Sequence, residues 1–303
     1  MDGVAPPLVG HNRSLLMSQT LSGLPFTKMT GSGNDFVFFD GREVSLERVT
    51  EPEVIRRICN RYNGIGSDGM VVLEPVTGTA DVIIHFFNQD GTAADLCGNA
   101  TLCSTALSAQ LGMAAATGMR LSTGAGLISS RLSADPGSQG VPEIDFQPVT
   151  DVRPDVAIAP VAGEHRLGFV IAGIPHLVIL CDDAEQVDVA GRGPALRWHP
   201  EGGATGANVN WVSRLPDGRW RYRTFERGVE GETLACGTGA VATAVLLRTW
   251  GHTSEDLVTI VSSSGRNLEV RLRPLAAESG PSGYRPTLRG EGRIVFRGVT
   301  GDL

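Results

Sequence analysis

The pattern of apolar and polar positions predicts short strands along most of the chain from residue 28 onward. Apolar runs of strand composition cover residues 36–40, 81–87 and 220–225, and they are separated by Gly and Pro. After the second run, Asp90-Gly91 predicts a hairpin whose returning strand spans 92–96. Strands that alternate with a few helical stretches indicate a mixed α and β architecture.

Two runs of small residues predict buried helices. They cover residues 97–111 and 236–250, each begins at a cysteine, and each stops at a glycine. Their lack of polar surface is typical of a helix surrounded by protein. Because each run follows a strand and a polar loop, we expect two topologically similar halves, joined somewhere within residues 135–160.

Composition narrows the class of protein. The 303 residues are 41% hydrophobic, enough for one or two packed cores. With 26 Lys and Arg against 33 Asp and Glu, the net charge is −7, so we expect neither a nucleic-acid partner nor a membrane surface as partner. No apolar run reaches the roughly 20 residues of a membrane span. No signal peptide is evident, so we expect a cytoplasmic protein whose residues 1–24 form a disordered extension.

The five cysteines do not fit a disulfide framework, and no cluster has the spacing of metal ligands. Cys97 and Cys236 instead stand at two predicted helix starts, where unpaired N–H groups bind carboxylates and lower a thiol pKa from about 8.5. We therefore expect thiolates. Facing each other across one carbon, the two sulfurs could remove and return a proton on opposite faces of a stereocentre. Structural thiols or a redox pair are the alternatives.

Other polar residues allow two interpretations each. The segment around Asn34 precedes a strand rather than a helix, so it predicts a turn and not a phosphate loop. Glu226 and Arg227 form either a surface ion pair or a ligand contact beside Cys236. His85 is expected to be hydrogen-bonded within a strand, and the role of His176 stays open.

Five motifs together resemble the diaminopimelate epimerase family. They are KMTGSGNDF at 28–36, FNQDG at 87–91, CGN at 97–99, ERG at 226–228 and ACGTG at 235–239. The resemblance extends from residue 26 to the C-terminus. It implies an α+β fold of two pseudo-symmetric domains, each a mixed β-sheet curled around a central helix, with the active site in the cleft between them. The domains would span 25–148, joined by a C-terminal strand at 288–303, and 149–287.

The resemblance also implies an activity. The family interconverts LL- and meso-diaminopimelate, a small amino-acid substrate, in lysine and peptidoglycan precursor synthesis, without cofactor or metal. A homodimer is common among its members. Carried over by motif, the catalytic residues are Cys97 and Cys236. The substrate-binding residues are Asn34, Asn88, Gly98, Asn99, Asn208, Glu226, Arg227, Gly237 and Thr238.

The chain departs from the family pattern at three positions. Gly69 stands where Gln is frequent, Leu102 replaces a basic residue, and Ile174 replaces an Asn. These changes keep open a racemase of the same fold that acts on another amino acid, for example histidine. A binding protein or thiol-redox module without catalysis is the third alternative.

Overall fold

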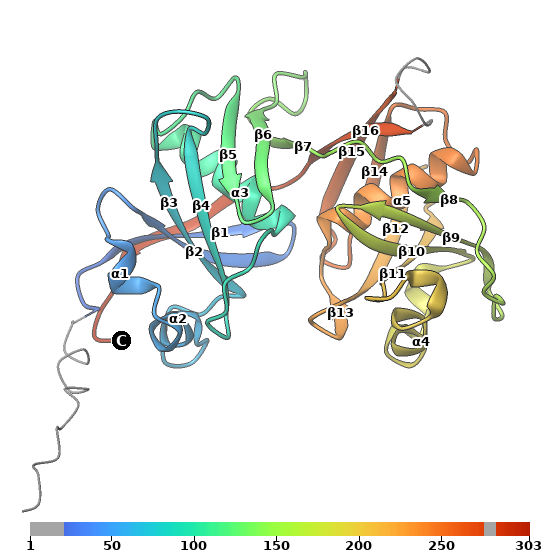
Figure 1. Ribbon diagram of the computed structural model, residues 1–303, viewed down its shortest axis with the longest axis horizontal. Helices are drawn as coiled ribbons and strands as arrows, with labels where there is room; N and C mark the ends of the chain where they lie inside the picture. Colours follow the sequence, from blue (N-terminus) through green and yellow to red (C-terminus); the bar gives the residue numbers. More distant parts are fainter. Residues whose placement is uncertain (1–20, 276–282) are drawn as a thin grey trace, which may run out of the picture.

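The computed structural model describes residues 21–275 and 283–303. Two stretches of chain contain the same order of elements, each with one thirteen-residue helix (Figure 1). The first stretch consists of β1 (Pro25–Gly31), β2 (Asn34–Asp40), β3 (Gly69–Pro75), β4 (Val82–Asn88), α3 (Gly98–Gln110), β5 (Met119–Thr123), β6 (Gly126–Leu132) and β7 (Pro142–Asp145). The second consists of β9 (Glu164–Ala172), β10 (Ile174–Cys181), β11 (Asn208–Arg214), β12 (Trp220–Glu226), α5 (Gly237–Thr249), β14 (Leu257–Val261), β15 (Asn267–Pro274) and β16 (Tyr284–Arg289).

The remaining elements are short. They are α1 (Leu46–Val49), α2 (Pro52–Cys59), β8 (Val152–Arg153), η1 (Ala184–Gln186), α4 (Val189–Arg197), η2 (Pro200–Gly202), β13 (Gly231–Thr233) and β17 (Arg293–Val299). We call the part built on α3 the first half and the part built on α5 the second half.

Strand pairing has the same order in both halves. In the first, β1–β2 is antiparallel, β2–β3 parallel, β3–β4 antiparallel, β4–β5 parallel, and β5–β6 and β6–β7 antiparallel. In the second, β9–β10, β10–β11, β11–β12, β12–β14, β14–β15 and β15–β16 follow the same sequence of directions. The chain is therefore α+β with an internal structural repeat, as the resemblance implied.

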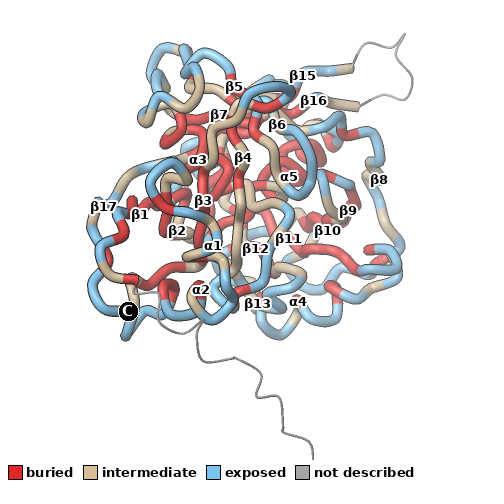
Figure 2. Tube along the Cα trace, turned by 60° about the vertical axis from the view of Figure 1, so that its left-hand side comes forward, coloured by how far each residue is buried: buried red, intermediate tan, exposed pale blue. Residues whose placement is uncertain are grey.

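The halves are joined by main-chain hydrogen bonds. Strand β16 pairs with β7 as well as β15, and β17 returns to pair with β1 (Figure 1). Buried residues gather along the strands and along α3 and α5 (Figure 2). Leu246 and Leu247 of α5 are fully buried, and each contributes about 2 kcal/mol to the hydrophobic free energy of folding.

Local chemistry explains why α3 and α5 stop where they do. Gly112 has φ +65° and Gly251 has φ +79°, left-handed conformations that glycine adopts without steric cost. The residue after each glycine donates its N–H to a carbonyl five residues back, which closes the last turn. Two buried hydroxyls of α3 are satisfied within the helix, because Ser104 and Thr105 each donate to a carbonyl four residues earlier.

Two expectations about local structure were wrong. Residues 92–96 do not form a returning strand, because only Ala93 bridges back to Phe87. Residues 21–24 are not a disordered extension: Leu21 and Leu24 are buried, and Leu24 exchanges hydrogen bonds with Thr300. The rest of the expected extension, 1–20, lies outside the described residues.

In the part of the chain that the structure describes, no helix has both the length and the apolar character needed to cross a membrane.

Candidate active site

The N-termini of α3 and α5 meet at two glycines. A Cβ atom on Gly98 would lie 3.6 Å from the Cα of Gly237, and the converse distance is also 3.6 Å. At Gly237 a Cβ would also come within 2.9 Å of Leu288 Cδ2, so the Leu288 side chain would have to shift to admit a larger residue. Cys97 and Cys236 are the N-cap residues of the two helices, so this close approach brings both cysteines to one place.

Cys236 is buried and held by several donors. Its Sγ atom accepts the N–H of Gly239 at 3.4 Å and lies 3.3 Å from Thr238 Oγ1 and 3.7 Å from Asn208 Nδ2. Burial raises the pKa of the Cys236 thiol far above its ordinary value, and the charge of Glu226 raises it further. The donors at Thr238 and Gly239 lower this pKa by less, so Cys236 is a neutral thiol.

Cys97 is half-buried and easier to ionise than Cys236. Burial raises the pKa of its thiol to about 11, the N–H groups of Ala100 and Asn99 lower it, and the charge of Glu226 raises it. The expectation that helix N-termini would make both cysteines thiolates was therefore wrong. At these positions, burial and a neighbouring carboxylate outweigh the N–H groups.

Glu226 ends strand β12, and its charge acts on both thiols. It accepts a short hydrogen bond from Thr233 Oγ1, and burial raises the pKa of its carboxyl group. Glu226 does not form the alternative surface ion pair with Arg227. The backbone N–H of Arg227 donates to Asn208 Oδ1 at 2.9 Å, and its guanidinium donates to Thr205 Oγ1 at 3.1 Å.

Amide side chains connect the first half to the residue before Cys236. Asn34 Nδ2 donates to Asp68 Oδ2 at 3.1 Å, and Asn99 Nδ2 donates to Asn34 Oδ1 at 2.7 Å. Asn99 Nδ2 also lies 3.3 Å from the carbonyl oxygen of Ala235. A carboxylate can only accept, so Asp68 fixes which end of Asn34 faces it, and Asn34 in turn fixes Asn99. We call this series of contacts the amide chain.

Charged residues that the sequence did not single out support the amide chain. Asp68 Oδ1 accepts from Arg61 at 2.6 Å, and Arg61 also pairs with Asp35. The buried Lys28 lies 2.7 Å from Asp35 and donates a short hydrogen bond to the Gly66 carbonyl. Burial alone would raise the pKa of Asp35, but Arg61 and Lys28 lower it to about 2.

The remaining amides and histidines have separate partners. Asn88, at the end of β4, donates from its side chain to Thr92 Oγ1 at 3.0 Å. His85 lies 2.7 Å from Glu74, as expected of a hydrogen-bonded strand residue.

His176 is fully buried beside Asn210, with its Nδ1 atom 3.1 Å from Asn210 Nδ2. Burial and then the charge of Arg227 lower the pKa of His176 to about 3, so this ring is neutral.

The three departures from the family pattern differ in their surroundings. A Cβ on Gly69 would lie 2.7 Å from the Phe87 carbonyl and 2.9 Å from the Phe86 ring, so no larger residue fits without movement of β4. Leu102 is fully buried in the hydrophobic cluster that surrounds α5. Ile174, the first residue of β10, is half-buried.

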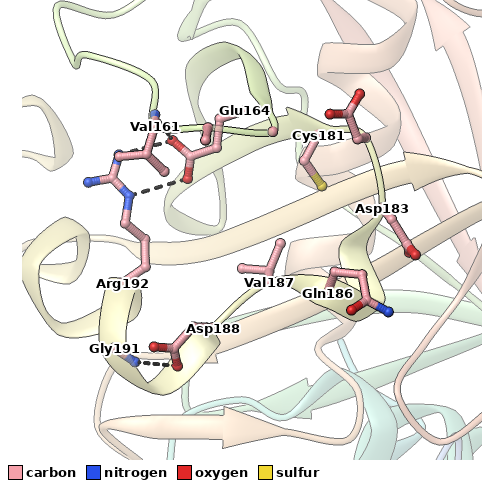
Figure 3. A pocket seen from close by; sticks show the side chains of 12 residues that line it. Val161, Glu164, Cys181, Asp183, Gln186, Val187, Asp188, Gly191 and Arg192 are labelled. Carbon is pink, nitrogen blue, oxygen red and sulfur yellow. Dashed lines mark hydrogen bonds and ion pairs between the residues drawn. The ribbon is translucent and has the colours of Figure 1, made fainter.

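A separate cavity lies between α4 and the β9–β10 pair, and none of the predicted site residues lines it (Figure 3). The Arg192 side chain reaches Glu164 across it, at 2.9 Å. Glu164 also accepts from Trp211 Nε1 and from the Val161 N–H. The buried charge in this cavity is thus satisfied by the protein itself.

Among residues 21–275 and 283–303, no group of three or more His, Cys, Asp or Glu residues is arranged to hold a metal ion. All five cysteines are free.

Sequence comparison finds close relatives. A profile described as diaminopimelate epimerase matches residues 26–142 and 168–275. A protein of Gemmatimonas aurantiaca named diaminopimelate epimerase is 67% identical over 283 residues, which cover 92% of this chain and 100% of that protein. A protein of Aquifex aeolicus with the same name is 34% identical over 255 residues, covering 82% of this chain and 89% of that protein.

Solved structures share the fold at low identity. A hydroxyproline epimerase from Agrobacterium vitis, with bound trans-4-hydroxy-L-proline, has a TM-score of 0.64 and 20% identity, covering 91% of this chain and 90% of that one. A PhzF-family phenazine biosynthesis protein from Bacillus anthracis has a TM-score of 0.70 and 13% identity, covering 91% and 98%.

Proposed function

The chain belongs to the diaminopimelate epimerase family, and from that premise we propose that it interconverts LL- and meso-diaminopimelate without a cofactor. The observation that carries the proposal is the meeting of two helix N-termini at Gly98 and Gly237, each preceded by a cysteine. The remaining expected site residues come from strands and loops of both halves.

The reacting carboxylate binds between the two helix N-termini. Backbone N–H groups at a helix start are unpaired and carry partial positive charge, so they suit an anion. A Cβ added to Gly98 or Gly237 would be in van der Waals contact with the Cα of the other glycine, and two helix starts this close can offer donors from both helices to one carboxylate. The same donors stabilise the negative charge that develops on the carboxylate when the α-proton leaves.

Proton transfer uses one thiolate and one thiol. In one direction Cys97, as thiolate, takes the α-proton and becomes a thiol, and the electron pair of the broken C–H bond spreads into the carboxylate. Cys236 then gives its proton to the opposite face and becomes the thiolate. The reverse reaction exchanges these roles, so each turnover leaves one proton between the two sulfurs. The substrate ammonium offsets the charge of Glu226, which favours the thiolate form.

Polar residues around the cysteines bind the rest of the substrate. Arg227 suits the distal carboxylate because its guanidinium is a fork of donors, and Asn208 orients the Arg227 backbone. The amide chain of Asn34 and Asn99 fixes the start of α3 beside the reacting centre. We also propose that the halves act as two domains, 25–148 with 288–303 and 149–287. A cytoplasmic location agrees with chemistry that requires reduced cysteines.

The test is proton NMR of LL-diaminopimelate with the reduced protein in heavy water. We expect the α-proton signal to fall while the meso isomer appears, and both changes to disappear in Cys97→Ser and in Cys236→Ser. Circular dichroism of the variants controls for folding. An active wild type whose exchange survives both substitutions contradicts the two-cysteine mechanism, and a wild type that leaves the α-proton in place contradicts the substrate.

A further inference from the structure

A buried tyrosine hydroxyl binds both backbone polar groups of Cys236. The Cys236 N–H donates to Tyr222 Oη at 2.6 Å, and Tyr222 Oη donates to the Cys236 carbonyl at 2.8 Å. A phenolic hydroxyl is both donor and acceptor, so the two bonds are chemically compatible. Tyr222 is fully inaccessible and belongs to the hydrophobic cluster around α5. The strand β12 therefore holds the start of α5 through one oxygen atom.

The start of α3 has no matching support. The Cys97 carbonyl accepts from the N–H and from the Oγ1 of Thr101, both at 2.9 Å, and Thr101 belongs to the same helix. The third residue of the seven-residue strand β4 is the apolar Ile84, whereas the third residue of the seven-residue strand β12 is Tyr222. The contact from strand to cysteine backbone is thus specific to the second half.

We propose that Tyr222 is a positioning residue that aims the Cys236 sulfur into the site. Both N-cap cysteines are extended, Cys97 with φ −134° and ψ 117° and Cys236 with φ −128° and ψ 111°. At Cys236 the tyrosine hydroxyl also binds this backbone, in the position from which Sγ accepts the Gly239 N–H. This role rests on the proposed function, because it assumes that Cys236 exchanges the substrate proton. Tyr222 itself touches neither substrate nor proton in this assignment.

Loss of the Tyr222 hydroxyl removes both hydrogen bonds, but the two backbone groups of Cys236 are affected differently. The Cys236 carbonyl keeps the helical hydrogen bond from Ala240 N–H at 2.9 Å. The Cys236 N–H loses the tyrosine oxygen, and a buried donor without a partner destabilises the local conformation. Once the N-cap can rotate, Sγ leaves the Gly239 N–H and its thiolate loses a stabilising donor.

The test compares Tyr222→Phe with Tyr284→Phe. Each variant loses one phenolic oxygen beside the same cluster, and Tyr284 lies on β16 away from Cys236. We expect Tyr222→Phe to lower kcat about tenfold with KM changed less than about twofold, since substrate contacts are retained. Tyr284→Phe should match the wild type. Equal kcat values for the two variants would overturn the proposal.

A second readout does not depend on turnover. Iodoacetamide labelling, followed by peptide mass spectrometry, gives the rate at each cysteine, and Cys97 is an internal reference. Positioning predicts a Cys236 to Cys97 rate ratio about tenfold lower in Tyr222→Phe, because less thiolate forms. A purely structural role predicts an unchanged or higher ratio, as Cys236 becomes more open. If the wild type does not epimerise diaminopimelate, the proposed function is refuted. The ratio of labelling rates at Cys236 and Cys97 still tests the positioning role of Tyr222.

Hydrogen exchange of the wild type keeps the proposal testable if Tyr222→Phe does not fold. In protein labelled with ¹⁵N-cysteine, the Cys236 amide should exchange at least about tenfold more slowly than the Cys97 amide, since it is bonded to a buried oxygen. Equal exchange at the two amides would overturn the proposal.

Discussion

The starts of α3 and α5 carry equivalent cysteines but are supported in different ways. At α3 the support is the amide chain, which leads through Asp68 to Arg61, whose side chain is half exposed. At α5 the support is the buried Tyr222 hydroxyl together with the half-buried Glu226. Strand pairing follows the same order around both helices, so the difference does not come from the order of the paired strands.

This difference separates the two cysteines chemically. Cys97 has a pKa of about 11, and burial with Glu226 raises the pKa of Cys236 further. A proton exchanged between two sulfurs needs both to ionise in turn, so the surroundings of Cys236 must be adjusted more when substrate binds. The comparison teaches that one repeated fold can hold two acid–base groups at one carbon while tuning each by its own neighbours.

Replacing either cysteine should have the largest effect on activity. Cys97→Ser and Cys236→Ser should each lower kcat by about 10²- to 10⁴-fold, because a serine hydroxyl does not ionise in this range. The double variant should lose little more than either single one, since the two sulfurs act as a unit. Steady-state epimerisation rates measure this. A double variant whose loss equals the product of the single losses would show two independent groups.

The ion pair between Asp35 and the buried Lys28 should stabilise the first half. Asp35→Asn leaves the buried Lys28 without its carboxylate, and we expect a loss of about 3 kcal/mol of unfolding free energy. Because the folded pKa of Asp35, about 2, lies below its ordinary value of 3.8, its contribution is complete above the ordinary value and disappears as the pH falls through about 2. Urea denaturation at about pH 6 and about pH 2.5 measures both effects.

Asp40→Asn is the matched control for that prediction. Asp40 lies on the same strand β2 and pairs with the exposed Arg42, so its loss should cost at most about 1 kcal/mol. The gap between wild type and Asp35→Asn should narrow at the lower pH. Equal losses for the two variants at about pH 6 would show that the Lys28 pair does not stabilise the first half.

Asp68→Asn tests the amide chain itself. A carboxamide at this position can present either its oxygen or its nitrogen to Asn34, so the orientations of Asn34 and Asn99 are no longer fixed. We expect kcat/KM for epimerisation to fall about tenfold with unfolding free energy changed by less than about 1 kcal/mol. Asp81→Asn removes another carboxylate paired with arginine in the same half and should leave kcat/KM unchanged. A matching loss in both variants would exclude the amide chain as the cause.

The sequence predicted the features that depend on neighbours along the chain. Both central helices, their cysteine N-caps and their glycine stops follow from runs of small residues between local signals. The strand expected at 92–96 from the Asp90-Gly91 turn is absent, because the chain after that turn pairs with β4 through one bridge only.

Contacts between residues far apart in the sequence could not be predicted from local patterns. Tyr222 looks like an ordinary strand residue, and only the fold brings its hydroxyl to Cys236. Asp68 and Arg61 lie in a polar loop without a motif of their own, although Lys28 and Asp35 fall inside the motif at 28–36. The thiolate expectation failed for a related reason, because helix position was visible in the sequence whereas burial and Glu226 were not.

The smallest predicted effect concerns Glu226, and it has the opposite sign to that of Tyr222. Glu226→Gln removes a negative charge that raises the pKa of both thiols. At Cys236 only burial has a larger effect, whereas at Cys97 burial and the Ala100 N–H both have larger effects. Below these pKa values more thiolate then forms, so iodoacetamide labelling should speed up several-fold at Cys236 and less at Cys97. Glu230→Gln, on the exposed loop beyond β12, should change neither rate. Slower labelling of Cys236 would mean that Glu226 serves mainly as its hydrogen-bond partner, and the contrast between the two helix starts would then rest on packing rather than on charge.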